Sequence, residues 1–221
     1  MNKYIIIAIT LLGTFLLHQI ITKTLEKKYT YSLMQSITED EETFAKKLDS
    51  VIVKYLIPIY NREFFRLNYY IVHSDTKKVK EQLAEMENLK MTSAQHLSLY
   101  QTVFKYFITI NKKTEARNIS RKINVLVDEN NMDKDIKTQH EMEIKIYLDK
   151  DIKTIPYIDS ILEDCSDQEK AVRYLEKTYI YKANDQLNNA KECMNKVIEY
   201  TTDEKQKQIF KDLLANNLKD L

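Results

Sequence analysis

The chain has 221 residues, and its 34 basic and 33 acidic side chains leave a net charge of only +1. Such a balance provides no strong field to attract nucleic acid. One glycine and two prolines are too few for the turns of a β-rich fold or for a glycine-rich phosphate loop. The remaining composition favours helices, so we predict an all-α fold.

The first predicted element is a transmembrane helix within residues 1–22. Residues 4–21 read YIIIAITLLGTFLLHQII and contain no Asp, Glu, Lys or Arg. A bilayer core needs about 20 helical residues, and flanking lysines can reach the headgroups to complete the span. No small-x-small cleavage site follows, which favours an uncleaved anchor over a cleaved signal peptide. Whether the anchor is ever cleaved stays open.

Lysines flank the predicted anchor unequally. Lys3 precedes it, whereas Lys23, Lys27 and Lys28 follow it. The positive-inside rule then places the remainder of the chain in the cytoplasm. We therefore expect a single-pass protein of the cell membrane with a cytoplasmic domain. The opposite topology, a signal anchor with its domain outside, stays open.

Residues 23–57 are predicted to form a helical stalk followed by a leading helix. A loose apolar stripe continues the first helix to about Gln35. Ser36 and Thr38 each have a glutamate three residues later, the pattern of a capping box at a helix start. The leading helix is expected to bury one apolar face. Its members are Phe44, Leu48, Val51, Ile52, Tyr55 and Leu56.

Residues 58–221 are predicted to contain four helix pairs and a final helix. Short polar breaks separate the two helices of each pair, at 73–75, 111–113, 149–151 and 184–185. A large aromatic residue precedes each break, at Tyr70, Phe107, Tyr147 and Tyr181, with intervals of 37, 40 and 34 residues. Nine residues after each aromatic lie Val79, Ala116, Pro156 and Ala190. A shared offset with a nearly constant period is typical of stacked helical repeats.

This pattern resembles the tetratricopeptide repeat (TPR) family, whose helix pairs recur about every 34 residues. The fourth pair matches best, with Tyr174, Thr178, Tyr181, Ala190, Met194 and Val197 at the family's offsets. The third pair departs from the pattern, because Pro156 stands where the family has alanine. Bulky residues also replace a small one before the aromatic in three pairs, at Leu67, Phe104 and Ile144. The resemblance implies an α-solenoid capped by the final helix.

The resemblance also implies a binding surface. In TPR proteins the first helix of each pair lines a concave groove that binds a protein or peptide. The positions carried over to this chain are Phe64, Asn68, Gln101, Lys105, Glu141, Lys145, Tyr179 and Lys182. The lysines and Asn68 among them are residue types that bind an acidic or C-terminal peptide. Phe64 stands where the family's carboxylate clamp has a basic residue, however, so this specificity is not assigned.

No catalytic or metal-binding constellation is found. The four histidines have no partner at ligand spacing, and no HExxH or GxSxG motif occurs. His140, Glu141 and Glu143 are interpreted as the polar surface of one helix. Cys165 and Cys193 lie 28 residues apart without a CxxC pattern and are expected to be unpaired. We therefore predict no enzyme activity, no catalytic residues, no metal and no cofactor.

The function expected from these features is that of a membrane-anchored TPR-like scaffold or adaptor that binds a protein partner in its groove. A structural, self-associating membrane component is the alternative, as is an ancillary factor in protein export or envelope assembly. Size-exclusion chromatography separates the self-associating component from a monomeric adaptor.

Overall fold

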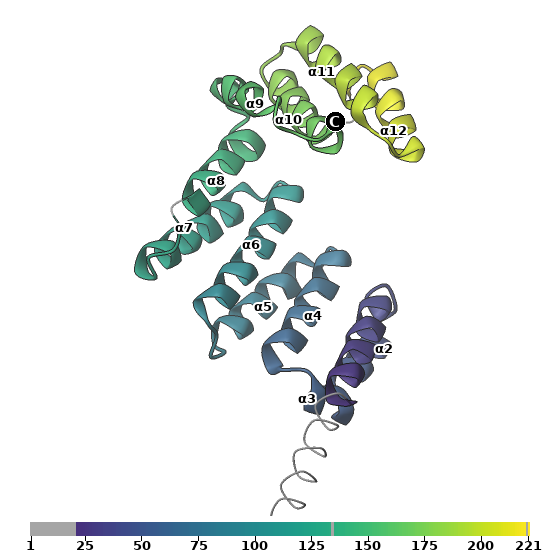
Figure 1. The fold of residues 1–221 in the computed structure, drawn as a ribbon, viewed down its shortest axis with the longest axis vertical. Coiled ribbons are helices and arrows are strands. Elements are labelled where there is room, and N and C mark those ends of the chain that lie inside the picture. Colours follow the sequence, from purple (N-terminus) through teal and green to yellow (C-terminus); the bar gives the residue numbers. More distant parts are fainter. Residues whose placement is uncertain (1–20, 134, 220) are drawn as a thin grey trace, which may run out of the picture. The chain divides into compact units, whose positions relative to one another are not determined.

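The structure is a computed structural model that describes residues 21–133, 135–219 and 221. Within these residues the regular elements are all helices and no strand occurs, which confirms the all-α prediction (Figure 1). No helix in this part of the chain combines the length and apolar character needed to cross a membrane. The predicted anchor at residues 4–21 lies outside the described residues except for Ile21.

Helices follow one another with short connections. Residues 21–36 are helical, which agrees with the predicted continuation to about Gln35. The elements after it are α2 (Glu41–Leu48), α3 (Val51–Leu56), α4 (Ile59–Val72), α5 (Thr76–Glu87), α6 (Ser93–Thr109), α7 (Lys113–Glu129), α8 (Asp135–Glu143), the π-helix η1 (Ile144–Asp149), the 3-10 helix η2 (Ile152–Thr154), α9 (Ile155–Ile161), α10 (Asp167–Ala183), α11 (Leu187–Tyr200) and α12 (Glu204–Ala215). The four predicted pairs therefore correspond to α4–α5, α6–α7, α8/η1–α9 and α10–α11.

The chain packs as two compact units that divide within α6, between Val103 and Phe104. In the first unit, one hydrophobic cluster joins the helix of residues 21–36 to α2, α3 and α4. Its buried members are Leu33, Phe44, Leu48, Val53, Leu56, Ile57 and Tyr69. The end of the first helix is therefore part of this core and not a free stalk.

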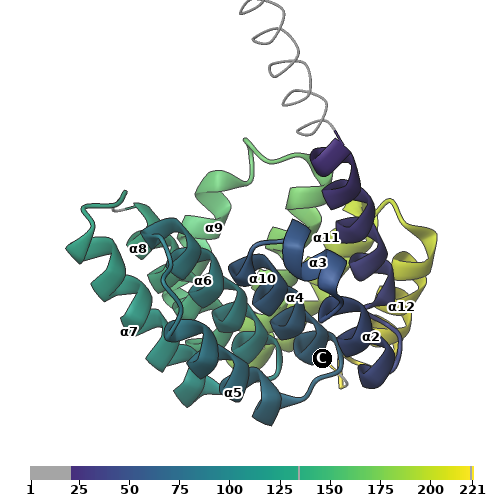
Figure 2. The same ribbon diagram turned by 90° about the horizontal axis from the view of Figure 1, so that it is seen from below.

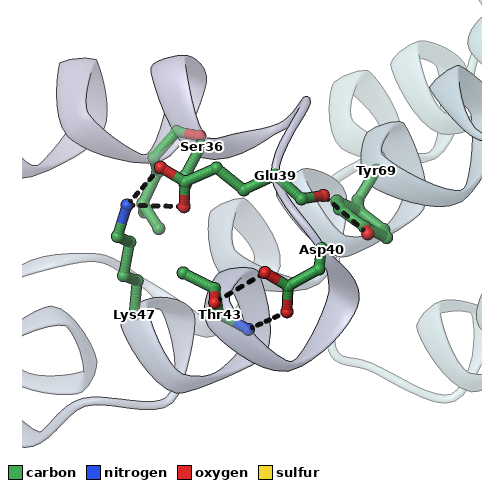
Figure 3. Close-up of polar contacts among 7 residues, drawn as sticks. Ser36, Glu39, Asp40, Thr43, Lys47 and Tyr69 are labelled. Carbon is green, nitrogen blue, oxygen red and sulfur yellow. Dashed lines mark hydrogen bonds and ion pairs between the residues drawn. The ribbon is translucent and has the colours of Figure 1, made fainter.

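The start of α2 differs from the prediction. Asp40 is the N-cap, and its carboxylate accepts a hydrogen bond from the backbone N–H of Thr43 at 2.9 Å (Figure 3). Ser36 belongs to the preceding helix, where its hydroxyl donates to the carbonyl of Leu33 at 3.0 Å. Glu39 pairs with Lys47 at 2.7 Å. The capping box predicted at Ser36 and Thr38 is therefore wrong, because an acidic residue further on caps the helix instead.

The single leading helix expected up to residue 57 is broken at Asp49 and Ser50. The Ser50 hydroxyl accepts a hydrogen bond from the backbone N–H of Val53 at 3.4 Å and starts α3. Because of this break, α3 does not continue the apolar face of α2. The prediction is wrong for three residues, since Val51, Ile52 and Tyr55 are 84%, 50% and 74% exposed.

The turns between the two helices of each pair share one backbone feature. One residue in each turn adopts a left-handed conformation, namely Ser74 (φ 56°), Asn111 (φ 54°), Lys150 (φ 53°) and Asp185 (φ 58°). In three turns the next amide donates to the carbonyl of the predicted aromatic, in the bonds Asp75 to Tyr70 (3.0 Å), Lys112 to Phe107 (2.8 Å) and Gln186 to Tyr181 (2.9 Å). This is the bond of a Schellman motif, which closes the end of a helix.

The third turn contains one extra residue. The amide of Asp151 donates to the carbonyl of Lys145 at 2.9 Å, six residues back instead of five. The insertion lies in the π-helix η1, in which one residue is commonly added to an α-helix. Ile146, which is buried, therefore takes the place of the aromatic that the sequence pattern assigned to Tyr147. In the same way Ile155 replaces Pro156.

The second unit has two further hydrophobic clusters. One contains Ile146, Ile155, Ile158 and Ile180, and the other contains Ala190, Met194, Val197 and Leu218. Helix α11 packs against both α10 and α12. Cys193 is buried, Cys165 is half-buried, and both are free thiols, as predicted.

Candidate binding groove in the second unit

Two adjoining cavities open on the second unit, and we call them together the groove. The larger, of about 790 Å³, is lined by residues of α6, α8, η1, α9 and α10. The smaller, of about 610 Å³, lies between α6, the end of η1 and α10. Both are lined by Ile108, Thr109 and Tyr147, so the two cavities adjoin at these residues.

The larger cavity is lined by apolar and polar side chains of the same helices. Its aliphatic residues and methionine are Ile108, Met142, Ile146, Ile161 and Val172. Its polar residues include Lys105, Thr109, Asp135, Thr138 and Gln139, and a further set that we call the polar wall, namely Glu143, Tyr147, Arg173 and Glu176. Mostly apolar lining with a few converging polar groups is the usual composition of a ligand site.

A buried charge network forms the polar wall. Arg173 Nη1 donates to both carboxylate oxygens of Glu176, at 2.9 and 2.8 Å, and the Tyr147 hydroxyl donates to Glu176 Oε1. Glu176 is only 3% exposed, so these two donors take the place of water around its carboxylate. Burial, reinforced by the charge of Glu176, raises the pKa of Tyr147 far above its ordinary value. Tyr147 therefore remains a neutral hydrogen-bond donor.

Three buried polar atoms beside this network lack a hydrogen bond among the described residues. They are Arg173 Nε, Glu143 Oε2 and His140 Nδ1. His140 Nδ1 lies 3.2 Å from Glu143 Oε2, so the two are close enough for an ion pair but not in hydrogen-bond geometry. Native structures seldom leave buried polar atoms unsatisfied. Arg173 and Glu143 also line the larger cavity, so charged side chains of both signs border it.

The sequence predicted that His140 lies on the polar surface of a helix, but the structure buries it. It is 3% exposed, and its ring meets Phe104 edge-on with 4.9 Å between centroids. Glu143 is half-buried, and only Glu141 of this trio is exposed. The interpretation of the three as one solvated surface is therefore wrong for His140 and Glu143.

The smaller cavity ends at lysine side chains. Lys150 is half-buried, with its ammonium 4.7 Å above the ring of Tyr179 and 5.9 Å from that of Tyr147. The side-chain amide of Asn184 donates a hydrogen bond to the backbone carbonyl of Lys150 at 2.8 Å. Burial, together with the nearby charge of Lys113, lowers the pKa of Lys150. Lys182 lines the same cavity, so this end of the groove is cationic.

Three of the predicted groove residues line these cavities. Lys105 lines the larger, and Tyr179 and Lys182 line the smaller. Glu141 and Lys145 are exposed and line neither. Met142, Glu143 and Ile146 of the same helices line the larger cavity instead.

The other three predicted residues do not line the groove. Gln101 is half-buried in α6 and contributes to neither cavity. Asn68 and Phe64 belong to the first unit. The Asn68 amide donates to the Phe64 carbonyl at 2.8 Å, and the Phe64 ring stacks on Tyr60 with 5.6 Å between centroids. Both of these contacts are made within α4.

The residues that sequence reasoning missed are Glu176, Arg173 and the polar role of Tyr147. The available signal is an arginine and a glutamate three residues apart on a predicted helix, in a chain with only five arginines. That spacing places two side chains on one helix face. It does not reveal that the face is buried.

Comparison with protein-family models, with curated proteins and with solved structures gives no match to this chain. Within the residues that the structure describes, no group of three or more His, Cys, Asp or Glu side chains is arranged to hold a metal ion. The geometry of the groove is therefore the main indication of function.

Proposed function

We propose that this protein is a membrane-anchored adaptor, with TPR-like repeats, that binds a segment of a partner protein in the groove. The observation that carries the proposal is the cavity of about 790 Å³ on the second unit. Besides α9, it is lined by α6, α8 with η1, and α10, which are the first helices of three successive predicted pairs. These are the helices that, by the resemblance, line a peptide-binding surface.

The lining indicates what the bound segment contains. An apolar side chain fits against Ile108, Met142 and Val172, and the hydrophobic effect supplies the affinity. The side chains of Arg173 and Glu143 line the same cavity as a hydrogen-bond donor and an acceptor, which match the polar groups of a peptide backbone. An apolar anchor with a few directional hydrogen bonds is a recurring mode of peptide recognition.

The predicted anchor supplies the second half of the proposal. Residues 4–21 would confine the groove to the membrane surface and raise its effective concentration toward membrane-bound partners. The lysine distribution around the anchor favours a groove on the cytoplasmic side. Tails of cytosolic and membrane proteins are then the available ligands.

Site-specific photo-crosslinking in cells tests the groove. We would place benzoylphenylalanine at Val172, which lines the larger cavity and is 47% exposed, in the full chain. Val125 in α7 is the matched control, since it is 54% exposed and lines neither cavity. We expect an adduct of discrete mass at position 172 only, with one peptide segment of the partner attached. Identical products from both positions, or none from either, would contradict the proposal.

A further inference from the structure

The segment from Val51 to Ile59 reads VIVKYLIPI and carries one charged residue, Lys54. One side of it, with Val53, Leu56 and Ile57, is buried in the core of the first unit. The other side is equally apolar but exposed. We call this outer side the α3 patch; it consists of Val51 (84% exposed), Ile52 (50%), Tyr55 (74%) and Ile59 (53%).

An apolar helix is normally covered on every side. A helix with hydrophobic residues all round is expected in a core or in a membrane. Contiguous exposed apolar patches mark surfaces that contact another protein or lipid. The α3 patch therefore requires an occupant.

The position of α3 identifies that occupant. Its inner face shares a cluster with Leu33 and Tyr29 of the helix of residues 21–36, and Figures 1 and 2 show α3 beside this helix. Tyr29 is eight residues from Ile21, which corresponds to about 12 Å along a helix. Ile21 ends the apolar run of residues 4–21. The patch thus lies within a short distance of the point where the chain is predicted to enter the bilayer.

We propose that the α3 patch rests in the lipid headgroup layer beside the anchor, with membrane lipid as its occupant. This inference depends on the anchor in the proposed function. Spanning helices tilt by roughly 0–40° from the bilayer normal. A tilt toward α3 lowers the patch into the headgroup layer, which is roughly 5–7 Å thick on each side of the hydrocarbon.

The chemistry of the surroundings fits an interfacial surface. Membrane-surface segments combine aliphatic side chains with tyrosine and lysine, and the α3 patch has Tyr55 at its centre and Lys54 beside it. Lys23, Lys27 and Lys28 are exposed on the helix that leads to the anchor. Lys54 lies 3.5 Å from Asp49, and both side chains are at least 40% exposed. So weak a surface pair leaves the ammonium available to a lipid phosphate.

The absence of tryptophan from the chain makes the inference easy to test. In Tyr55→Trp the new indole is the only tryptophan of the full chain. The protein would be reconstituted into phosphatidylcholine–phosphatidylglycerol vesicles, with or without bromine on the acyl chains near the headgroups. We expect brominated lipid to quench the emission of this indole. Val125→Trp, at a position of the second unit that is 54% exposed, serves as the control and should keep its emission.

Co-flotation with the vesicles separates the two proposals. A Tyr55→Trp chain that floats but whose indole emission is insensitive to bromine retains the anchor and overturns the α3 patch as a lipid contact. A blue-shifted but unquenched indole emission also overturns it, because a second copy or another protein then covers the patch. A chain that does not float overturns both proposals. Val51→Trp repeats the measurement if circular dichroism shows that Tyr55→Trp has not folded.

Discussion

At the scale of single residues, the groove depends on one buried ion pair. Glu176 is 3% exposed, and the side chain of Arg173 is 35% exposed. Removing one member of such a pair leaves the other charged and desolvated, so the loss exceeds the net contribution of the intact pair. The pair also holds Arg173 in the lining of the larger cavity. Stability and binding are therefore coupled at this position.

The first prediction concerns Glu176→Ala. We expect the free energy of unfolding to fall by about 2–3 kcal/mol, less than for a fully buried pair because Arg173 is one-third exposed. Urea unfolding of the full chain in detergent, followed by circular dichroism, measures the change. Glu199→Ala is the control, since Lys196 and Glu199 have the same spacing at 2.7 Å but are about half exposed. We expect a change of less than about 0.5 kcal/mol there; equal losses would argue against the network.

Of the predicted groove residues, Lys105, Tyr179 and Lys182 line the two cavities, and each precedes a regular Schellman turn. Glu141 lies just before the π-helix η1 and Lys145 lies within it, and the apolar pattern does not reveal its extra residue. Arg173 and Glu176 carry charges three residues apart, a pattern that usually belongs to a solvated helix face.

At the scale of elements, the notable feature is how the turns are made. Gly13 is the only glycine in the chain, yet seven described non-glycine residues have positive φ. Four of these residues occupy the turns within the helix pairs. A side chain in the left-handed region costs roughly 1–2 kcal/mol, somewhat less for Asn and Asp. These turns are consequently places where stability can be gained.

The second prediction is that Asp185→Gly stabilises the chain. Asp185 is exposed at φ 58°, so glycine relieves the left-handed strain without removing a buried contact. We expect a gain of about 0.5–1 kcal/mol after the larger entropy of glycine in the unfolded chain is included. Lys211→Gly in the exposed interior of α12 is the control and should lose about 1 kcal/mol. A loss in both variants, measured by urea unfolding, would contradict the turn geometry.

Helix positions from α4 onward agree with the polar breaks in the sequence, because each break combines turn-forming residues with the end of an apolar stripe. The region before α4 was harder to predict. Ser50 lies inside an apparently continuous apolar pattern, and its role as an N-cap depends on a hydrogen bond to Val53. Asp49 and Ser50 are residue types that favour a helix boundary, but the apolar spacing of their neighbours continues across them.

At the scale of the whole molecule, the proposed adaptor role depends on two features in different parts of the chain. One is the predicted anchor at residues 4–21, and the other is the groove on the second unit. Neither alone specifies the proposed role. A groove without an anchor describes a soluble binder, and an anchor without a groove describes only a membrane component. The adaptor role requires that binding in the groove depend on tethering.

The most direct measurement is whether the Val172 crosslink depends on the anchor. Leu11→Arg combined with Leu12→Arg places two charges inside the apolar run, which prevents its insertion. We expect the discrete adduct at position 172 to appear with the intact chain and to be lost in the double variant at equal protein level and helicity. An adduct of the same identity and yield in both chains would show that the groove binds its partner without the membrane, and the proposed role of tethering would be wrong.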